Sequence, residues 1–357
     1  MLLKEQYFPA ISYQQLAKDL YQLYPKFSVE EFYQQAIQDL DNLELKQRVK
    51  RAAQIIRKFL PDNYEAALEI LLAYSAKQPN SFYNIFLPQF VQDYGLDHFD
   101  LSLQALKEFT KSSSSEEAIR YFLLSDFAAT MRYIKDFAQD ENYHVRRLAS
   151  EGTRPRLPWC IQLKMIKENP RLSLPILEML KTDPEKYVQK SVANHLNDIS
   201  KDHADFLAKY LADWDVQQPV TKWIIGHGTR TLVKQGHQET LKLLGYEKAE
   251  IAVENFTVPT IVKFGQDLHF SFQLKNPLAR AQDLIIDYKI SFMRKNGQQN
   301  QKVFKLTKCQ LAAQADLTLQ KYYDFTDKST RKHYPGEHRL TLLINGQEFN
   351  SADFELK

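Results

Sequence analysis

The stretch DPEKYVQKSVANHLNDIS, residues 183–200, decides the fold of the larger part of the chain. Its apolar residues recur every three or four positions, and they are Val188, Val192, Leu196 and Ile199. This spacing predicts an amphipathic helix with one buried stripe. Asp183 stands just before the stripe, where a negative charge complements the positive end of the helix dipole.

The same pattern occurs on both sides of this stretch. An aspartate, four further residues and a valine open each copy, as Asp140 to Val145, Asp183 to Val188 and Asp215 to Val220. The aspartates are 43 and 32 residues apart, which is close to the length of a HEAT repeat. We therefore predict an α-α superhelix of HEAT-like repeats, whose stacked helix pairs form a concave surface. The first 120 residues show no clear copy, so the number of repeats stays open.

The apolar period changes at about residue 250. Segments such as LHFSFQLK (268–275), LIIDYKISFMRK (284–295) and HRLTLLING (338–346) alternate in polarity or are rich in β-branched and aromatic residues. Turn signals such as FGQD and KNGQQ separate them. Short strands at this spacing predict a β-sandwich. We place a helical domain at residues 1–248 and the sandwich at residues 249–357.

The composition excludes several classes of protein. The 357 residues carry a net charge of only +3, so a nucleic-acid surface must be a local patch. The two cysteines lie far apart in the sequence and fit a reducing compartment. The N-terminal MLLKEQYFPA lacks the pattern of a signal peptide, and no apolar run approaches the roughly 20 residues of a membrane helix. We expect a soluble cytoplasmic protein.

The stretch HVRRLASEGTRPRLPW, residues 144–159, carries the candidate chemistry. Its arginines indicate a phosphate-binding patch, and they are Arg146, Arg147, Arg154 and Arg156. Glu151 stays ionised if it lies close to them, and Trp159 offers the aromatic face that best attracts a cation. A fixed carboxylate beside an aromatic face suits a positively charged nucleobase lesion, because cleavage of its weakened glycosidic bond passes through an oxocarbenium-like sugar. The alternative is a structural ion pair at a helix end beside a core tryptophan.

Alignment of the repeats predicts a polar ridge that continues this site. Its members are Arg147 and Glu151 in the first copy, Lys190, Asn194 and Asp198 in the second, and Arg230 in the third. Residues four apart share one face of a helix, and these lie away from the apolar stripe. The alternative is a set of solvated charge pairs on the outside of the repeats.

A metal site and a thiol nucleophile are disfavoured. The histidines at 195, 203 and 227 are 8 and 24 residues apart, which matches no common ligand motif. We therefore predict no metal, and we predict that His195, four positions before a residue of the buried stripe, is structural. Cys160 follows Trp159 without a paired histidine, which favours a small core residue.

The two long motifs resemble the AlkC branch of the AlkC/AlkD DNA alkylation repair glycosylases. RRLASEGTRPRLPW (146–159) is similar to the central motif of that family, and DPEKYVQKSVANHLNDISKDH (183–203) is similar to its second motif. Four further segments of this chain resemble other parts of the family's helical domain, and they are 43–71, 114–123, 223–236 and 241–246. LIIDYKISFMRKNG, KVFKL and YPGEHRLTLLING resemble the immunoglobulin-like appendage of some members, so the resemblance covers nearly the whole chain.

The resemblance implies a HEAT-like solenoid that holds double-stranded DNA, followed by an immunoglobulin-like β-sandwich that assists DNA binding. It implies monofunctional removal of 3-methyladenine and 3-methylcytosine, without metal or cofactor, and we expect a monomer. The site residues that it implies are Asp198, Glu151, Trp159 and Glu116. The basic residues expected to contact DNA or to orient the carboxylates are Arg147, Arg154, Arg156, Arg146, Lys190 and Arg230.

Two features depart from the family pattern. Gly226 and Gly228 stand where bulkier helix formers are usual, which predicts a weaker helix or a close backbone approach. Glu117 follows Glu116 where an apolar residue is more usual, and we favour Glu116 as the glutamate that faces the site.

The competing reading is a non-catalytic HEAT-repeat protein that binds DNA or acts as a scaffold, because the fold alone does not determine function. A third reading is a protein-interaction module that uses the sandwich. The acidic positions beside Trp159 favour the enzyme, because a protein that only binds DNA gains nothing from carboxylates among its phosphate contacts.

Overall fold

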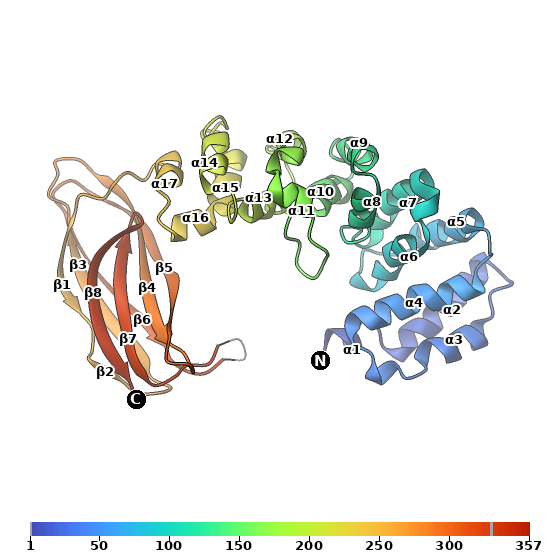
Figure 1. Cartoon of the computed structure of the whole chain (residues 1–357), viewed down its shortest axis with the longest axis horizontal. Coiled ribbons are helices and arrows are strands. Elements are labelled where there is room, and N and C mark those ends of the chain that lie inside the picture. The colour runs from blue at the N-terminus through green and yellow to red at the C-terminus, as the bar shows by residue number, and fades with distance from the viewer. Residues whose placement is uncertain (1, 329–330) are drawn as a thin grey trace. The chain divides into compact units, whose positions relative to one another are not determined.

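The computed structural model describes residues 2–328 and 331–357. The chain divides into two compact units, which meet between Ile199 and Ser200. The first unit is helical, and the second contains further helices followed by all of the strands (Figure 1).

The α-helices of the first unit are α1 (Leu3–Tyr7), α2 (Ala10–Leu23), α3 (Val29–Ile37), α4 (Leu45–Phe59), α5 (Tyr64–Ser75), α6 (Phe86–Tyr94), α7 (Phe99–Ser112), α8 (Ile119–Ser125), α9 (Phe127–Phe137), α10 (Tyr143–Gly152), α11 (Lys164–Glu168), α12 (Leu174–Leu180) and α13 (Lys186–Ile199). Short 3-10 helices lie between them at η1 (Leu40–Asn42), η2 (Phe82–Ile85), η3 (Leu96–His98) and η4 (Pro170–Leu172). Neighbouring helices pack in pairs, and α10 lies against both α7 and α13. This packing brings the two long sequence motifs together.

The buried stripe that the sequence predicts on α13 is confirmed. Val188, Val192, Leu196 and Ile199 are all 0–1% exposed. The corresponding stripe of α10 contains Val145 and Leu148, which are both fully buried. The valine of each copy is expected to begin the buried stripe, and this is wrong by one position in the third copy, where Val220 is only half-buried and burial begins at Thr221. Because α15 begins at Pro219, it starts one residue later after its aspartate than α10 and α13 do.

The aspartate that opens each repeat has the same local role in all three copies. Its Oδ1 accepts a hydrogen bond from the backbone N–H two residues on, in each case at 2.8 Å. The donors are the amides of Asn142, Glu185 and Gln217. An aspartate that accepts in this way forms an Asx turn and turns the chain into the helix. The repeat in the sequence is therefore a repeat of one helix-entry turn.

The second unit contains the helices α14 (Ala204–Leu211), α15 (Pro219–Gly228), α16 (Arg230–Lys234) and α17 (Gln238–Leu243). Its strands are β1 (Ala252–Thr257), β2 (Ile261–Val262), β3 (Asp267–Lys275), β4 (Gln282–Met293), β5 (Gln299–Leu311), β6 (Asp316–Asp324), β7 (Gly336–Ile344) and β8 (Gln347–Leu356). The strands form one sheet of order β1-β3-β6 and another of order β2-β8-β7-β4-β5. Among the described strands, all pairs are antiparallel except β2 with β8.

The two sheets enclose one apolar core. Phe270 of β3 and Tyr288 of β4 belong to different sheets, and their ring centroids are 5.1 Å apart. Alternate residues of β3 are buried, as the period of two in its sequence predicts. The prediction of a helical region followed by an immunoglobulin-like β-sandwich is therefore confirmed.

The last helices of the second unit pack tightly on the β7–β8 hairpin. Asn345, at the hairpin turn, donates from Nδ2 to the carbonyl of Glu247 at 2.8 Å and accepts from the amide of Ile285 at 2.7 Å. Gly346 faces Gly236, and a Cβ on Gly346 would lie 2.4 Å from the Cα of Gly236. These contacts join the end of the helical segment to the sandwich, and both belong to the unit that begins at Ser200, while the domain boundary at 248/249 stays a prediction.

Candidate active site

One arginine connects the two carboxylates that the sequence singles out. Glu151 lies in the last turn of α10, Asp198 lies in the last turn of α13, and both are buried. Arg154 donates from Nη1 to Oε1 of Glu151 at 2.6 Å and from Nε to Oδ2 of Asp198 at 2.9 Å. Because α10 packs on α13, the packing of the repeats fixes the distance between the two acids.

A second arginine extends this arrangement to Glu116. Arg147 donates from Nη1 to Oε2 of Glu116 at 2.9 Å and to Oγ of Ser114 at 2.8 Å. Its Nη2 lies 3.5 Å from Oε1 of Glu151, and its guanidinium lies 4.9 Å from the ring centroid of Tyr187. The acidic network therefore runs from Asp198 through Arg154, Glu151 and Arg147 to Glu116.

Glu151 is held in its ionised form. Burial by itself favours the neutral acid, but the charges of Arg147 and Arg154 outweigh burial and lower the pKa of Glu151 below its ordinary value. Ser191 contributes to this effect, since its hydroxyl donates to Oε2 of Glu151 at 2.6 Å. Glu151 is therefore a fixed negative charge, held between two guanidiniums in a poorly solvated place.

Trp159 lies in the loop that joins α10 to α11, residues 153–163, which projects beyond these two helices (Figure 1) and which we call the Trp159 loop. Its side chain is 74% exposed, and its φ of 64° lies in the left-handed region that a bulky residue rarely adopts. The core tryptophan that the sequence left open is therefore excluded. Such backbone strain persists only where contacts with the surrounding structure hold the residue in that conformation.

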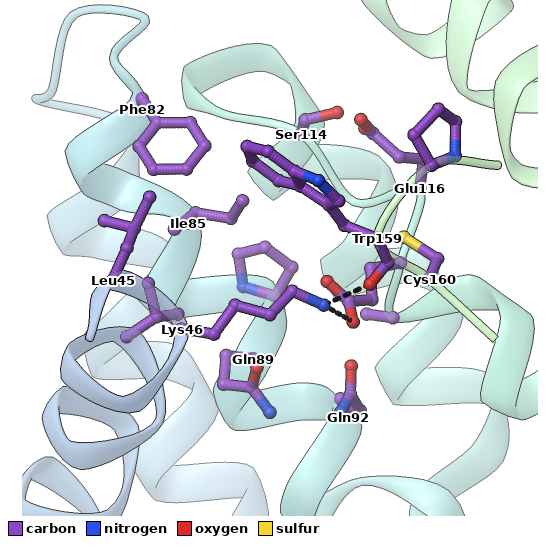
Figure 2. Close-up of a pocket in the computed structure, with 15 residues that line it drawn as sticks. Leu45, Lys46, Phe82, Ile85, Gln89, Gln92, Ser114, Glu116, Trp159 and Cys160 are labelled. Carbon is purple, nitrogen blue, oxygen red and sulfur yellow. Dashed lines mark hydrogen bonds and ion pairs between the residues drawn. The ribbon is translucent and has the colours of Figure 1, made fainter. Parts of the chain in front are cut away.

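The indole of Trp159 covers a pocket between α4, η2 and the loop that follows α7 (Figure 2). We call it the Trp159 pocket, and its lining includes Leu45, Lys46, Phe82, Ile85, Glu116 and Cys160. Lys46 donates from Nζ to the carbonyl oxygen of Trp159 and, at 2.6 Å, to Glu117. The two neighbouring glutamates therefore have different partners, because Glu116 joins the acidic network and Glu117 holds the Trp159 loop through Lys46.

Cys160 stays a thiol at neutral pH. Burial, reinforced by the negative charge of Glu117, raises the pKa of the Cys160 thiol to about 12. A nucleophilic cysteine requires the thiolate, so Cys160 is unsuited to covalent chemistry.

The predicted DNA-binding residues are placed in different ways. Arg146 binds Asp183 through Nε at 2.6 Å and donates to the carbonyls of residues 140 and 141, so its guanidinium is engaged within the protein. Lys190 is exposed on α13, and Arg156 is half-buried in the Trp159 loop. Arg230 begins α16 in the second unit, where its Nη1 donates to the carbonyl of His227 at 2.6 Å. Phosphate contacts by these residues stay predictions.

Three side chains around the acidic network were not predicted, namely Ser114, Tyr187 and Ser191. A signal for two of them was present in the sequence. Tyr187 and Ser191 precede Asp198 by eleven and seven residues, so all three share one face of α13. Tracing the face of α13 that carries Asp198 back towards the start of the helix therefore identifies Tyr187 and Ser191. Ser114 has no such signal, because its position depends on how α7 packs against α10.

His195 is a structural histidine. It is fully buried, with Nδ1 3.1 Å from the carbonyl of Ser150 and Nε2 3.1 Å from Oγ of Ser173. Burial lowers the pKa of His195 to about 4, so the ring is neutral and connects α13 to the neighbouring helices. Within residues 2–328 and 331–357, no group of three or more histidine, cysteine, aspartate or glutamate side chains is arranged to hold a metal. In the same residues, no helix is both long and apolar enough to cross a lipid bilayer.

Known proteins resemble this chain in both its helical part and its sandwich. Residues 85–232 match the family model described as DNA alkylation repair enzyme, and residues 252–357 match the C-terminal Ig-like domain of the uncharacterised protein YhaZ. The chain is 40% identical over 336 residues to uncharacterized protein YhaZ of Bacillus subtilis (strain 168), which covers 93% of each chain.

A solved structure is similar along the whole chain. The alkylpurine DNA glycosylase AlkC of Pseudomonas fluorescens, bound to DNA containing an abasic site analog, is 39% identical, with a TM-score of 0.95 and coverage of 100% of both chains. The chain therefore belongs to the DNA alkylation repair enzymes, in the AlkC branch that carries a C-terminal immunoglobulin-like domain.

Proposed function

We propose that this protein is a monofunctional DNA glycosylase that hydrolyses the N-glycosidic bond of cationic N3-alkylated bases, 3-methyladenine and 3-methylcytosine, in duplex DNA. The observation that supports this most directly is that Arg154 binds both Glu151 and Asp198. The similarity to a glycosylase that was solved on DNA supports it independently.

The chemistry needs little acid catalysis, because the base already carries a positive charge. As the bond between C1′ and the base nitrogen breaks, its electron pair neutralises the base and the sugar becomes oxocarbenium-like. Fixed negative charge stabilises that sugar cation in the transition state. Water then forms the new bond at C1′ and loses its proton to a carboxylate or to solvent. Of Asp198 and Glu151, one stabilises the sugar and the other positions the water.

Trp159 gives the preference for a cation. Its ring is exposed beside the Trp159 pocket, and an indole face attracts a methylated, positively charged base more strongly than a neutral one. Glu116 lines the same pocket and has the most exposed carboxylate of the acidic network, with 22% of its side chain accessible. Glu116 is therefore the acid of the network that solvent and substrate meet first.

DNA contacts come from basic groups outside the acidic network. Arg147 and Arg154 orient carboxylates, so Arg156 and Lys190 are the candidates for phosphate in the first unit. In the sandwich, the β4–β5 hairpin turn presents the exposed Lys295. We propose that the protein acts as a monomer in the cytoplasm, without metal or cofactor.

The test is release of methylated bases from alkylated duplex DNA, measured by chromatography under single-turnover conditions. Glu151→Gln and Asp198→Asn are each expected to slow release by about 10²–10³-fold, the usual effect of removing preorganised electrostatic stabilisation. Asp183→Asn is the matched control, because the buried Asp183 also joins α10, through Arg146, to the turn that precedes α13. Release by the two site variants within a few-fold of this control would contradict the assignment. DNA binding without base release by the wild type would favour the non-catalytic reading.

A further inference from the structure

We propose that Arg120 is a positioning residue of the active site, which holds Trp159 at a fixed place relative to the acidic network. Arg120 lies on α8 and is 0% exposed. This inference rests on the proposed function, because the active site that Arg120 positions is itself proposed. Arg120 touches neither substrate nor carboxylate.

Arg120 binds the Trp159 loop at both of its ends. Its Nη1 donates to the carbonyls of Gly152 at 3.0 Å and Arg154 at 2.7 Å, where the chain leaves α10. Its Nε donates to the carbonyl of Ile161 at 2.7 Å, two residues after Trp159. One rigid, planar guanidinium therefore fixes the distance between the start and the end of the loop.

The start of the loop is also the centre of the acidic network. Arg154 offers its carbonyl to Arg120 while its own guanidinium binds Glu151 and Asp198. A shift of that peptide would move the guanidinium and the carboxylates together. Arg120 therefore connects the position of the aromatic ring to the position of the acids.

The helices α8 and α10 pack closely against each other beside Arg120. A Cβ on Gly152 would lie 2.6 Å from Cγ2 of Ile119, the residue just before Arg120. Glycine at 152 thus lets the end of α10 approach α8 closely enough for the hydrogen bonds of Arg120.

General stability is a poor explanation for this arrangement. Burial of a guanidinium is costly, and here burial lowers the pKa of Arg120 to about 10. In addition, Nη2 has no hydrogen-bond partner among the described residues. Arg120 instead holds a loop in which Trp159 has a positive φ, and backbone strain of this kind persists only where the surrounding structure enforces it.

The chain contains a matched control for Arg120. Arg48 on α4 is 3% exposed, and its guanidinium donates to the carbonyls of Lys4, Phe8 and Leu43. It performs the same structural task among the N-terminal helices, and none of its described hydrogen bonds reaches the Trp159 loop or the acidic network. Arg48→Met therefore measures the loss of a buried, carbonyl-binding guanidinium by itself.

The experiment compares Arg120→Met with Arg48→Met. We expect Arg120→Met to slow single-turnover base release by about tenfold or more relative to Arg48→Met, because small displacements of reacting groups reduce rates steeply. The Kd for methylated duplex DNA is expected to stay within about threefold, since the phosphate-binding side chains are unchanged. Arg120→Lys, which retains a charge and can reach some of the carbonyls, is expected to recover part of the rate. Equal release rates for the two methionine variants would overturn the proposal.

A second measurement reports on the loop without any catalysis. In a background with Trp214 and Trp223 replaced by phenylalanine, time-resolved fluorescence anisotropy follows Trp159 alone. Arg120→Met is expected to increase the nanosecond motion of the indole, and Arg48→Met is expected to leave it unchanged. If Arg120→Met does not fold, the Arg120→Lys and Arg48→Lys pair carries both comparisons. If the wild type releases no base, the proposed function fails, while the anisotropy still decides whether Arg120 holds the loop.

Discussion

Replacement of Arg154 by methionine tests the electrostatic design of the site most directly. The change keeps much of the side-chain volume but removes both hydrogen bonds, at 2.6 Å to Glu151 and 2.9 Å to Asp198. Hydrogen bonds to charged groups contribute about 1.5–3 kcal/mol each, and loss of one partner of a buried ion pair costs about 3–5 kcal/mol. With the carboxylates 5% and 2% exposed, we expect a loss of about 3–5 kcal/mol in the free energy of unfolding at pH 7.5.

The pH dependence of this loss has a definite sign. Loss of Arg154 removes one of the two arginine charges that lower the pKa of Glu151, so the folded-state pKa of Glu151 rises and the folded variant binds a proton more readily than the folded wild type does. The deficit of Arg154→Met is therefore largest at neutral pH and shrinks as the pH falls through the raised pKa. Denaturant unfolding at pH 7.5 and pH 5 measures both values.

An exposed pair of similar geometry provides the control. Arg339 binds Asp353 at 2.6 and 2.8 Å, but the two side chains are 54% and 45% exposed. Arg339→Met is therefore expected to change the free energy of unfolding little at either pH, because an exposed ion pair is screened by solvent. A deficit for Arg154→Met no larger than this, or one that grows as the pH falls, would refute the reasoning.

Three further predictions concern other parts of the molecule. The folded-state pKa of His195 is about 4 against an ordinary 6.5, so its contribution to stability is complete above pH 6.5 and is lost as the pH falls towards 4. Unfolding curves of the wild type between pH 7 and 4.5 should show this loss, which approaches about 3 kcal/mol, and His195→Gln should lack it. Ser191→Ala removes the 2.6 Å hydrogen bond to Glu151, and we expect base release to slow by about tenfold while far-ultraviolet circular dichroism is unchanged. An unchanged rate would mean that Ser191 does not orient the carboxylate. Gly226→Ala should stabilise the protein by up to about 1 kcal/mol, because the new Cβ would meet only Cδ2 of Leu244, at 3.9 Å. A lower midpoint of thermal unfolding would show instead that the helix needs glycine there.

The sequence was sufficient to predict the two halves of the chain, because each half has a persistent apolar period. It failed where that period is weak. Strand β8, with the sequence QEFNSADFEL, was not predicted, because its alternation is largely polar and few of its residues are buried. The third repeat was shifted by one residue, because the turn before α15 is longer than the turns in the other two copies.

The sequence predicted which residues form the candidate site, but it did not predict which of them pair with one another. Arg146, Arg147 and Arg154 are the same residue type within one motif, and no sequence pattern separates them. Their partners separate them, since Arg146 binds Asp183 while the other two bind the acidic network. Arg120 was missed because its partners are backbone carbonyls, which leave no signature in the sequence.

The contact between Gly236 and Gly346 in the second unit limits where the chain can be truncated without damage to the fold. Gly236 and Gly346 touch through their backbones, and a Cβ on Gly346 would lie 2.9 Å from Cδ1 of Leu241, which is itself 1% exposed. A truncation at residue 248 would uncover this leucine and would remove Asn345 from the carbonyl of Glu247. A loss of DNA binding in such a fragment would then report damage to α16 and α17 as much as the absence of the sandwich. Substitutions at solvent-exposed positions of the sandwich leave the contact between Gly236 and Gly346 intact. They are therefore the better way to measure what the sandwich contributes to DNA binding.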